Sequence, residues 1–545
     1  MARPPLPCTL TPHAPRRATL TPHAPRRATL TPHAPSRVPL PLRHHRAAGS
    51  CALATALHLA TALHLAAGCA VSPEARPTTT PHPPPERPAV ARPGALAPES
   101  PCRAPLDARD FGAGRGAPEG DAPALQRAIR AASAHPEPCV YLPPGTYVVR
   151  RAPGQPLLDV PIRPEVDGLT FHGAPDGTSR IVLEADTFAI LVNKGDRAPL
   201  QPVQGLTLRH LTIEVTGGHG LSDASAIQLN HCPDVHVDDI RIRMDARAQV
   251  ARGLKMSGLA TSQGTSGLLE HLHVDGVSKA GIYLASGTHH LTVRSSETLH
   301  AWNTPPINAP PPGLSISDAH DITVIDHHAH HNRGAGLLIG VNGAPPVRVP
   351  GLPATAYGAY YPAAQAHGPA TRIRVLGGSF SDNGDEGGTG VVIGSAYPEV
   401  PRDITLTDVL ARDNRGTGIL IEAGEAITLD GAVVTGNGAQ GILVRDVVLP
   451  GHAPGAPRTA GIRLLNALIH DNGRAVRVDV GGLEIRGGVE RVTLSGGIIA
   501  AGDAGSHQRM GVRIVPEGER ACRGFITEGL PRIAAPVLFE GAGVP

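Results

Sequence analysis

Short runs of alternating apolar and polar residues recur along this chain, and a glycine leads each of them. Gly418 and Gly441 lead two runs that lie 23 residues apart, and Asn414 and Asn437 show the same spacing. Such alternation predicts short β-strands. A unit this short, with no helix of its own, cannot bury its apolar face and must stack on copies of itself. The runs are GLKMSG (253–258), GIYLASG (281–287), GLSISDA (313–319), GLLIG (336–340), GVVIGSA (390–396), GILIEAG (418–424), GILVRD (441–446) and GIRLLN (461–466).

The pattern therefore predicts a solenoid, with roughly a dozen coils between residues 160 and 515. One helix is expected before them, over residues 122–134, where the apolar positions follow a helical period. Its apolar residues share one face: Leu125, Ala128, Ile129 and Ala132. We expect this helix to cover the open apolar end of the solenoid, which is otherwise exposed to edge pairing.

The first 105 residues lack the strand pattern. Residues 1–42 repeat a decapeptide of the form TLTPHAPRRA, to which we assign no structure. A basic RHHR, an apolar stretch (51–68) and then Cys69 resemble a bacterial lipoprotein signal, which implies export and lipid attachment at Cys69. The alternative is a duplicated Ala/Leu tract with no targeting role. Residues 70–105 are rich in Pro, Thr and Ala, as is typical of a disordered tether.

The folded part begins with a segment of recognisable form. Residues 107–149 contain, in order, DFGA (110–113), Asp121, Q-x-A-I (126–129) and PPGTY (143–147). This order resembles the opening segment of the pectate-lyase-like superfamily. The resemblance implies an all-β fold, a single-stranded right-handed parallel β-helix with an N-terminal capping helix. It says little about activity, because polygalacturonases, lyases, epimerases and phage tailspikes share this fold. We expect the β-helix over residues 106–520 and a C-terminal tail over 521–545.

Composition narrows the choice of partners. The net charge is +2, which gives no reason to expect nucleic acid as a partner. The seven cysteines show no metal-ligand spacing. Cys102 and Cys139 flank the first folded segment and are candidates for a disulfide in an exported protein. Cys232 lies inside a coil, where a buried thiol is expected.

Alternation along the glycine-led strands also predicts which side chains point outward. The predicted outward row begins with polar residues: Gln228, Lys255, Tyr283 and Ser315. It continues with aliphatic ones: Leu338, Val392, Leu420 and Leu443. Because neighbouring coils lie about 4.8 Å apart, the polar residues form a track roughly 15 Å long. This predicts a polar groove over the early and middle coils and nowhere else.

Charged residues precede the same strands and add candidates for a site. Those expected to contact a substrate are Asp223, Arg252, Lys279, Arg333, Asp385 and Glu386. Polygalacturonase-like enzymes place catalytic carboxylates here, whereas lyases place a Lys, Arg, Tyr or His that takes a proton beside a uronate carboxylate. The polygalacturonase set is absent in its order, so elimination is favoured over hydrolysis. Lys255, Lys279 and Tyr283 are the catalytic candidates. The alternative for each residue is a solvated outer-face position.

Three motifs have weaker claims. Asp318-Ala319-His320-Asp321 is similar to the D-P-H-D motif of alginate epimerases, but its register is that of an ordinary turn. The histidines of DHHAHHN (326–332) alternate in direction, which favours a surface over a metal site. Asp385 and Glu386, with Asp382, are candidates for calcium or for the acid and base of an inverting hydrolase, against a solvated turn.

Two insertions carry four of the chain's eight Trp and Tyr residues. Residues 296–312 contain Trp302, and residues 342–370 contain Tyr360 with two further tyrosines. Flat rings on loops suit stacking on sugar faces. The alternative is that they fix their own loops to the solenoid.

These observations favour an exported polysaccharide-active enzyme that acts on acidic glycans as a lyase or epimerase. The alternatives are a non-catalytic glycan-binding or structural cell-surface β-helix and an inverting glycoside hydrolase. The expected partner is a polysaccharide, with the membrane reached only through a lipid anchor, and the expected state is a monomer. No cofactor is indicated with certainty, and Ca²⁺ is the one candidate.

Overall fold

The computed structural model describes most of the chain after residue 101. The described residues are 102–152, 155, 160–184, 187–192, 201–216, 224–251, 256–285, 287–303, 310–340, 368–384, 388–394, 400–447, 459–503, 505–516, 520, 522–529 and 531–539. The chain divides into two compact units, Met1–Arg92 and Pro93–Pro545, and every described residue lies in the second. None of the helices among the described residues has the length and apolar character to span a bilayer.

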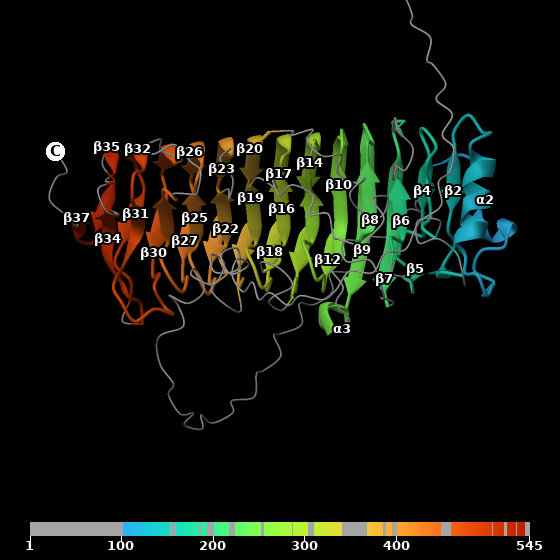
Figure 1. The fold of residues 1–545 in the computed structure, drawn as a ribbon, viewed down its shortest axis with the longest axis horizontal. Coiled ribbons are helices and arrows are strands. Elements are labelled where there is room, and N and C mark those ends of the chain that lie inside the picture. The colour runs from blue at the N-terminus through green and yellow to red at the C-terminus, as the bar shows by residue number, and fades with distance from the viewer. Residues whose placement is uncertain are drawn as a thin grey trace, which may run out of the picture. The chain divides into compact units, whose positions relative to one another are not determined.

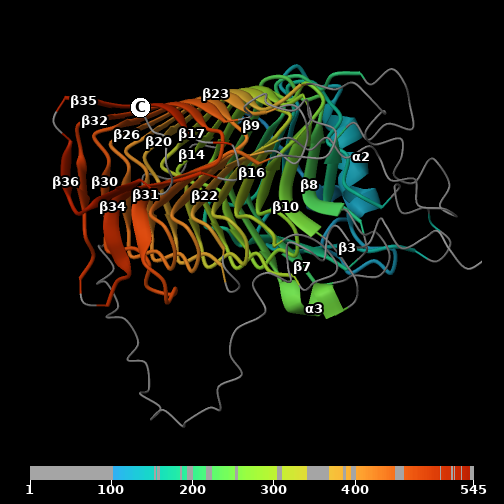
Figure 2. The ribbon, with the colours of Figure 1, turned by 60° about the vertical axis from the view of Figure 1, so that its left-hand side comes forward.

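Parallel strands dominate the second unit and form a 12-stranded and a 25-stranded sheet. In the described part of the chain every strand pairing is parallel, and each strand pairs with its counterpart in the neighbouring coil, as Figures 1 and 2 show. The predicted all-β fold, a single-stranded right-handed parallel β-helix, is confirmed.

The strands of the two sheets have the following bounds. The 12-stranded sheet contains β6 (Ile190–Val192), β8 (Ala224–Asn230), β10 (Met256–Ser262), β13 (Ile282–Leu284), β16 (Leu314–Ser317), β19 (Leu337–Gly340), β22 (Val391–Gly394), β25 (Ile419–Glu422), β28 (Ile442–Arg445), β31 (Val480–Arg486), β34 (Gln508–Val515) and β37 (Val537–Phe539). The 25-stranded sheet contains β1 (Leu106–Asp107), β2 (Cys139–Tyr141), β3 (Gly145–Val149), β4 (Thr170–His172), β5 (Ser179–Leu183), β7 (Thr207–Val215), β9 (Val235–Met244), β11 (Gly267–Glu270), β12 (His273–Asp275), β14 (His289–Arg294), β15 (Glu297–Leu299), β17 (His320–Ile325), β18 (His328–His330), β20 (Thr371–Leu376), β21 (Ser379–Ser381), β23 (Arg402–Thr407), β24 (Leu410–Arg412), β26 (Glu425–Asp430), β27 (Val433–Thr435), β29 (Ala460–Leu465), β30 (Leu468–His470), β32 (Glu490–Ser495), β33 (Ile498–Ala500), β35 (Arg523–Glu528) and β36 (Arg532–Ala534).

Stacked aliphatic side chains fill the interior. In the 12-stranded sheet one inward row is formed by register partners that are fully buried: Ile227, Leu259, Ile282, Leu314, Leu337, Val391, Ile419, Ile442, Leu483 and Val512. Such rows bury β-branched and γ-branched aliphatic side chains against neighbours of similar size, which explains why the core needs few aromatic residues.

A ladder of buried amides runs beside this core, at the turns that precede β19, β22, β25, β28 and β31. Asn332 donates from Nδ2 to Oδ1 of Asn383 (3.1 Å), and the same bond repeats from Asn383 to Asn414 (3.1 Å) and from Asn414 to Asn437 (2.9 Å). It continues to Asn472 and ends at Gln508. Each amide also bonds to main-chain groups, so buried turns that would otherwise leave polar atoms unsatisfied are paired coil to coil.

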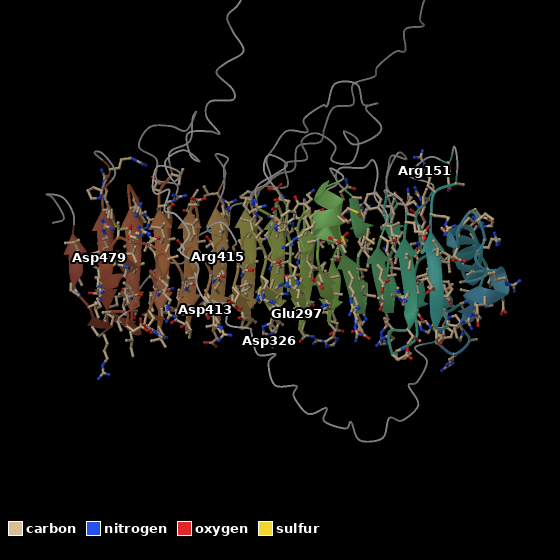
Figure 3. All side chains as sticks on the ribbon, turned by 90° about the horizontal axis from the view of Figure 1, so that it is seen from below. Arg151, Glu297, Asp326, Asp413, Arg415 and Asp479 are labelled. Atoms are coloured by element: carbon tan, nitrogen blue, oxygen red, sulfur yellow. A yellow bond between two sulfur atoms is a disulfide. The ribbon has the colours of Figure 1, made fainter. Side chains whose placement is uncertain are left out.

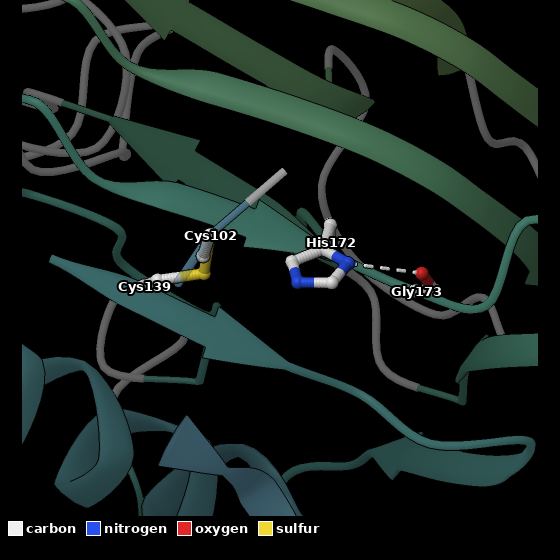
Figure 4. Close-up of a disulfide and its surroundings, with 4 residues drawn as sticks. All are labelled: Cys102, Cys139, His172 and Gly173. Carbon is white, nitrogen blue, oxygen red and sulfur yellow. Dashed lines mark hydrogen bonds between the residues drawn. A yellow bond between two sulfur atoms is a disulfide. The ribbon is translucent and has the colours of Figure 1, made fainter. Parts of the chain in front are cut away.

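A helical cap begins the β-helix. Helix η1 (Ala108–Phe111) and helix α2 (Ala122–Ala132) lie at the N-terminal end of the strand stack, where α2 contacts β2 (Figure 1). The four residues predicted to face the solenoid are all buried. A disulfide joins the candidate pair Cys102 and Cys139, whose Cα atoms lie 6.3 Å apart (Figure 4), which decides a question that the sequence left open. Cys232 is a buried thiol, as expected.

The other end of the solenoid reaches beyond the expected boundary at residue 520. Strands β35, β36 and β37 pair with β32, β33 and β34 and add a further coil. This last coil leaves the apolar side chains of Ile526, Val537 and Leu538 exposed.

We expect Asn414→Ala to lower the free energy of unfolding by about 3 kcal/mol or more, because it leaves several buried partners of one amide unpaired. Denaturant unfolding measures the change. Thr428→Ala, on the outer half-buried face of β26, is the control and should cost less than about 1 kcal/mol. Equal effects of the two substitutions would contradict a structural role for the ladder.

Cys139→Ala, or reduction of the wild type, should destabilise the protein by about 2–4 kcal/mol, because the disulfide closes a loop of 37 residues. Thermal unfolding with and without reductant measures this loss. Reductant should leave the thermal stability of the Cys139→Ala variant unchanged. If reductant also leaves the wild type unchanged, the disulfide does not stabilise the cap.

His327 should make the fold sensitive to acid. The side chain is fully buried, its Nε2 lies 3.1 Å from Oγ1 of Thr298, and its Nδ1 has no partner among the described residues. Burial lowers the pKa of His327 to about 3 from its ordinary value of 6.5, while the unfolded chain keeps the ordinary value. The unfolded state therefore binds the extra proton between those two pKa values, and stability falls as pH falls through that window.

The substitution His327→Gln removes this proton-linked loss. The Tm of the wild type should fall more steeply than that of the variant between about pH 7 and pH 4. Parallel Tm profiles for the two proteins would contradict the assignment.

Candidate functional site

The outer face of the 12-stranded sheet carries most of the predicted outward row. Register pairs place Tyr283 beside Ser315, and Ser315 beside Leu338. The row then passes through Val392, Leu420 and Leu443, as the alternation predicted. Gln228 also lies in this row.

One member of the row was assigned wrongly. Ala260, and not Lys255, is the register partner of both Gln228 and Tyr283. The sequence offers two glycines here, and Gly258, inside β10, is the one that aligns with Gly281 in the next coil. A Cβ on Gly258 would lie 2.5 Å from the carbonyl oxygen of Gly281, so this position tolerates no side chain in the stack. Lys255 itself lies outside the described residues.

Lys279 and Tyr283 come together as predicted. The Nζ atom of Lys279 lies 5.5 Å from the centre of the Tyr283 ring, which is within the range of a cation–π contact. Tyr283 is only 8% exposed and packs with small residues, Ala260, Ala280 and Ala285. The ring is therefore held in a fixed position on the sheet.

Two arginines contact the ring of Trp302, in the turns beside the 12-stranded sheet. The guanidinium carbons of Arg247 and Arg333 each lie 5.6 Å from the centre of the indole ring. Main-chain bonds stack the turns that carry these groups, since Trp302 donates to the carbonyl of Val277 and Arg333 to that of Ala301. The ring thus holds guanidinium groups, which favours the view that Trp302 positions its surroundings over direct stacking on a sugar.

Arg247 was not predicted. It lies on α3 (Ala246–Ala251), a short helix inserted between β9 and β10. The extra residues between two glycine-led strands were the one signal in the sequence for this element.

A second polar row, also missed, lies one step further along the strands. Ser262 donates to Oδ1 of Asn230 (2.6 Å), and Gln228 donates from Nε2 to the same oxygen (2.7 Å). Ser315 and Ser317 lie on one strand with their hydroxyls 3.4 Å apart. The early coils therefore carry hydrogen-bonded hydroxyl and amide groups beside Tyr283, and those of Asn230, Ser262, Ser315 and Ser317 are buried.

Polar character returns at the far end of the face, contrary to the prediction of a groove over the early and middle coils only. Glu484 follows Leu443 in the outward row, and Arg513 follows Glu484. The missed signal was the GGLEIRG segment (481–487), whose Gly482 continues the glycine positions. Glu422, Arg445 and Arg486 lie in the adjacent row.

The 25-stranded sheet carries paired charges on its outer face. Four register partners on neighbouring strands carry charges in the order positive, negative, negative, positive: Arg209, Asp238, Glu270 and Arg294. Burial raises the pKa of Asp238, but hydrogen bonds from His271 and Arg209 outweigh burial and leave the pKa below its usual value. The pKa of Glu270 is lowered in the same way, with burial opposed by Arg294 and His236.

These carboxylates stay ionised and are unsuited to donate a proton as a general acid. Atoms of His236, Asp238 and Glu270 that could bind a metal ion lie within 4.8 Å of one another. The two arginines already neutralise both carboxylates, however, so the arrangement does not call for a cation. Glu297, labelled in Figure 3, is bridged similarly by His273 and His330 at 2.8 Å each.

The weaker motifs behave as turns and surface. Asp321 adopts a positive φ of 56°, as do Asp234 (57°) and His290 (47°) before equivalent strands. Asp321 is held by Arg372 at 2.6 and 2.7 Å, and this bond lowers its pKa well below the usual value. In the segment 326–332, His327 is buried and His328 exposed, so the predicted divergence is confirmed.

A cavity of about 600 Å³ lies elsewhere, at the N-terminal cap, where His135, Glu137 and Asp167 line it. None of the predicted site residues borders this cavity.

Comparison with known protein families supports the resemblance of the opening segment to the pectate-lyase-like superfamily. Residues 106–303 match the protein-family model described as rhamnogalacturonase A/epimerase, pectate lyase-like. The stacked parallel sheets agree with that match. Residues 106–303 are therefore pectate-lyase-like, and the chain has the parallel β-helix fold.

Solved structures share this parallel β-helix fold. The A-module of mannuronan C-5 epimerase AlgE6 from Azotobacter vinelandii is 19% identical, with a TM-score of 0.51, over 79% of this chain and 100% of that module. The pre-mature gene product 12 of bacteriophage phi29 is 15% identical, with a TM-score of 0.51, over 81% of this chain and 57% of that one. At these identities the likeness shows the fold alone. No curated protein sequence matches the chain.

Several predicted site residues lie outside the described residues. Besides Lys255 they are Cys69, Asp223, Arg252, Tyr360, Asp385 and Glu386. Their roles remain predictions, as do lipid attachment at Cys69 and a calcium ion or an inverting acid–base pair at Asp385 and Glu386.

Proposed function

We propose that the outer face of β8, β10, β13 and β16 binds an acidic glycan and acts on it as a lyase or epimerase. One observation carries the proposal. Three cationic side chains, those of Lys279, Arg247 and Arg333, are held against aromatic rings at the edge of a face rich in hydroxyl and amide groups. Fixed cations of this kind suit recognition of a uronate carboxylate, and the polar rows suit sugar hydroxyls.

The chemistry follows from what such cations do to a bound uronate. Elimination and epimerisation both begin when a base removes the proton from the carbon that carries the carboxylate. Negative charge then develops on the carboxylate oxygens, where an arginine or lysine stabilises it. In elimination the leaving sugar oxygen departs from the adjacent carbon with the electron pair, whereas in epimerisation a proton returns from the opposite side.

Tyr283 is the described residue best placed to move that proton. Its ring lies against Lys279, with the Nζ atom 5.5 Å from the ring centre. Lys279 would then attract the substrate carboxylate. The matched family model is described as rhamnogalacturonase A/epimerase, and a mannuronan C-5 epimerase is among the similar structures, which supports epimerisation as one candidate reaction.

Glycan binding without catalysis is the second candidate. It is favoured by the low exposure of Tyr283, at 8%, and by the engagement of the Trp302 ring with two arginines. Inverting hydrolysis is the third candidate, with Asp385 and Glu386 as its acid and base. The Asp238 and Glu270 carboxylates are unsuited to the acid role, because their pKa values are lowered.

We propose an exported, lipid-anchored monomer as the working form. The disulfide between Cys102 and Cys139 supports a location outside the reducing cytosol. The anchor at Cys69 rests on the sequence pattern alone, and mass spectrometry of the membrane fraction tests it.

We expect Tyr283→Phe to reduce the formation of unsaturated product from uronate polymers by about 10²-fold or more while binding is retained. Lys279→Gln should both weaken binding and slow turnover. Ultraviolet absorbance of the unsaturated ends detects elimination, and a change in uronate epimer ratio by NMR detects epimerisation.

Tyr141→Phe is the matched control, since Tyr141 stacks on His172 at the cap, away from the proposed face. Activity that survives in Tyr283→Phe would exclude this tyrosine as the base. Saturable binding with no product from any uronate polymer would favour the non-catalytic candidate.

A further inference from the structure

The disulfide of the N-terminal cap has a histidine beside it. The Sγ atoms of Cys102 and Cys139 and a ring nitrogen of His172 all lie within 4.8 Å of one another. Strand register pairs Cys139 with Thr170 and Tyr141 with His172, so these four side chains share one face of β2 and β4. The two cysteines and the histidine are all buried. The spacing of cysteines along the sequence could not show this cluster, because only the stacking of coils brings its members together.

His172 is held in the form in which histidine binds a metal ion. Its Nδ1 lies 3.1 Å from the carbonyl oxygen of Gly173, and because a carbonyl only accepts, Nδ1 donates. Nε2 therefore carries the lone pair. The ring of Tyr141 stacks on the imidazole, with 5.1 Å between the ring centres, and fixes its orientation. Histidine ligands of metal ions commonly donate the other ring N–H to a backbone carbonyl in this way.

The lone pair of Nε2 is unsatisfied while the disulfide is intact. The side chain of His172 is only 4% exposed, and Nε2 has no hydrogen-bond partner in the described part of the chain. Figure 4 shows that the ring edge carrying this nitrogen faces the disulfide. A disulfide has no proton to offer, whereas reduction would place two thiol groups beside the nitrogen. The cluster thus has a buried ligand atom that the oxidised state leaves unused.

A cavity gives an ion access to the cluster. Cys102 lines the cavity of about 600 Å³ at the cap, together with Glu137 and Asp167. Both carboxylic residues are exposed, so they add negative charge at the entrance. An entry path and room for a water molecule are requirements of a metal site, and this cavity supplies both.

We infer that Cys102, Cys139 and His172 bind Zn²⁺ when the disulfide is reduced. Two thiolates and one imidazole are ligands that Zn²⁺ prefers, and a water from the cavity would complete the tetrahedron. A tetrahedral ion holds two sulfur atoms about 3.8 Å apart, which two side chains can reach from Cα atoms separated by 6.3 Å.

Reduction and metal binding occur in sequence. The S–S bond takes two electrons from a thiol or phosphine reductant, which is itself oxidised, and two protons from water. Zn²⁺ then displaces the two thiol protons and binds the thiolates. The disulfide would therefore hold the cap in an oxidising compartment, and the metal ion would hold it in a reducing one. This inference does not depend on the proposed glycan activity.

The test uses the full chain without oxygen, reduced with a phosphine because dithiol reductants bind Zn²⁺ themselves. Calorimetry measures Zn²⁺ binding, and Co²⁺ serves as a spectroscopic probe of tetrahedral thiolate coordination. The variant Cys139→Ala gives the background from the other cysteines. His172→Gln removes the third ligand, and His135→Gln is the matched control, since His135 is an exposed histidine that lines the same cavity. The Tm of each variant is measured first.

We expect the reduced wild type to bind one Zn²⁺ per chain more than Cys139→Ala does, and to give a thiolate charge-transfer band with Co²⁺. His172→Gln should weaken Zn²⁺ binding about tenfold or more, because loss of even an outer partner of a ligand costs about 10–100-fold. His135→Gln should change Kd less than twofold. Equal Zn²⁺ binding by the reduced wild type and Cys139→Ala, or an unchanged Kd in His172→Gln, overturns the inference.

Thermal unfolding gives a second measure that needs no variant at the histidine. Zn²⁺ should raise the Tm of the reduced wild type, and EDTA should reverse the gain, because a ligand that binds only the folded state stabilises it. Zn²⁺ should leave the Tm of the oxidised wild type and of reduced Cys139→Ala unchanged. A reduced wild type whose Tm does not respond to Zn²⁺ would also overturn the inference.

Discussion

Coil-to-coil pairing of buried polar groups is the constraint on which the rest of the structure depends. In this parallel β-helix the coils contain buried turns between strands. The main-chain amide and carbonyl groups of these turns are removed from water. The row from Asn332 to Gln508 pairs these groups with the next coil in line. Because every amide both donates and accepts along the axis, a coil is satisfied only when its neighbours are present.

The same stacking decides where chemistry can lie. A side chain on one strand has its register partners on the strands before and after it, so function is built from rows and not from sequence neighbours. Tyr283, Ser315 and Gln228 share a face for this reason, although they come from separate coils. Insertions between strands then add what a regular coil cannot supply, as α3 does with Arg247.

Charged residues on neighbouring strands pair in two different arrangements. On the 25-stranded sheet, acids and bases on neighbouring strands neutralise one another, as Asp238 and Arg209 do. On the 12-stranded sheet the fully buried Glu484 pairs with Arg486 and Arg513, which stay partly exposed. In both arrangements the paired charges join neighbouring coils.

Much of the fold was determined by the sequence alone. The 23-residue spacing, the apolar face of residues 122–134 and the pair Cys102–Cys139 are local or periodic signals, and each one led to the correct element. Alternation within a strand also predicted the side on which Tyr283 and Ser315 lie. What sequence could not decide was the register between coils whose connections differ in length. In the sequence, Gly253 and Gly258 are equally good candidates for the glycine position of this coil. Only the close approach to Gly281 shows that Gly258 belongs to the stack, and the strand register then places Ala260 in the outward row. The burial of Glu484 and its pairing with Arg513 could not be predicted for the same reason, since they depend on which strands become neighbours in space.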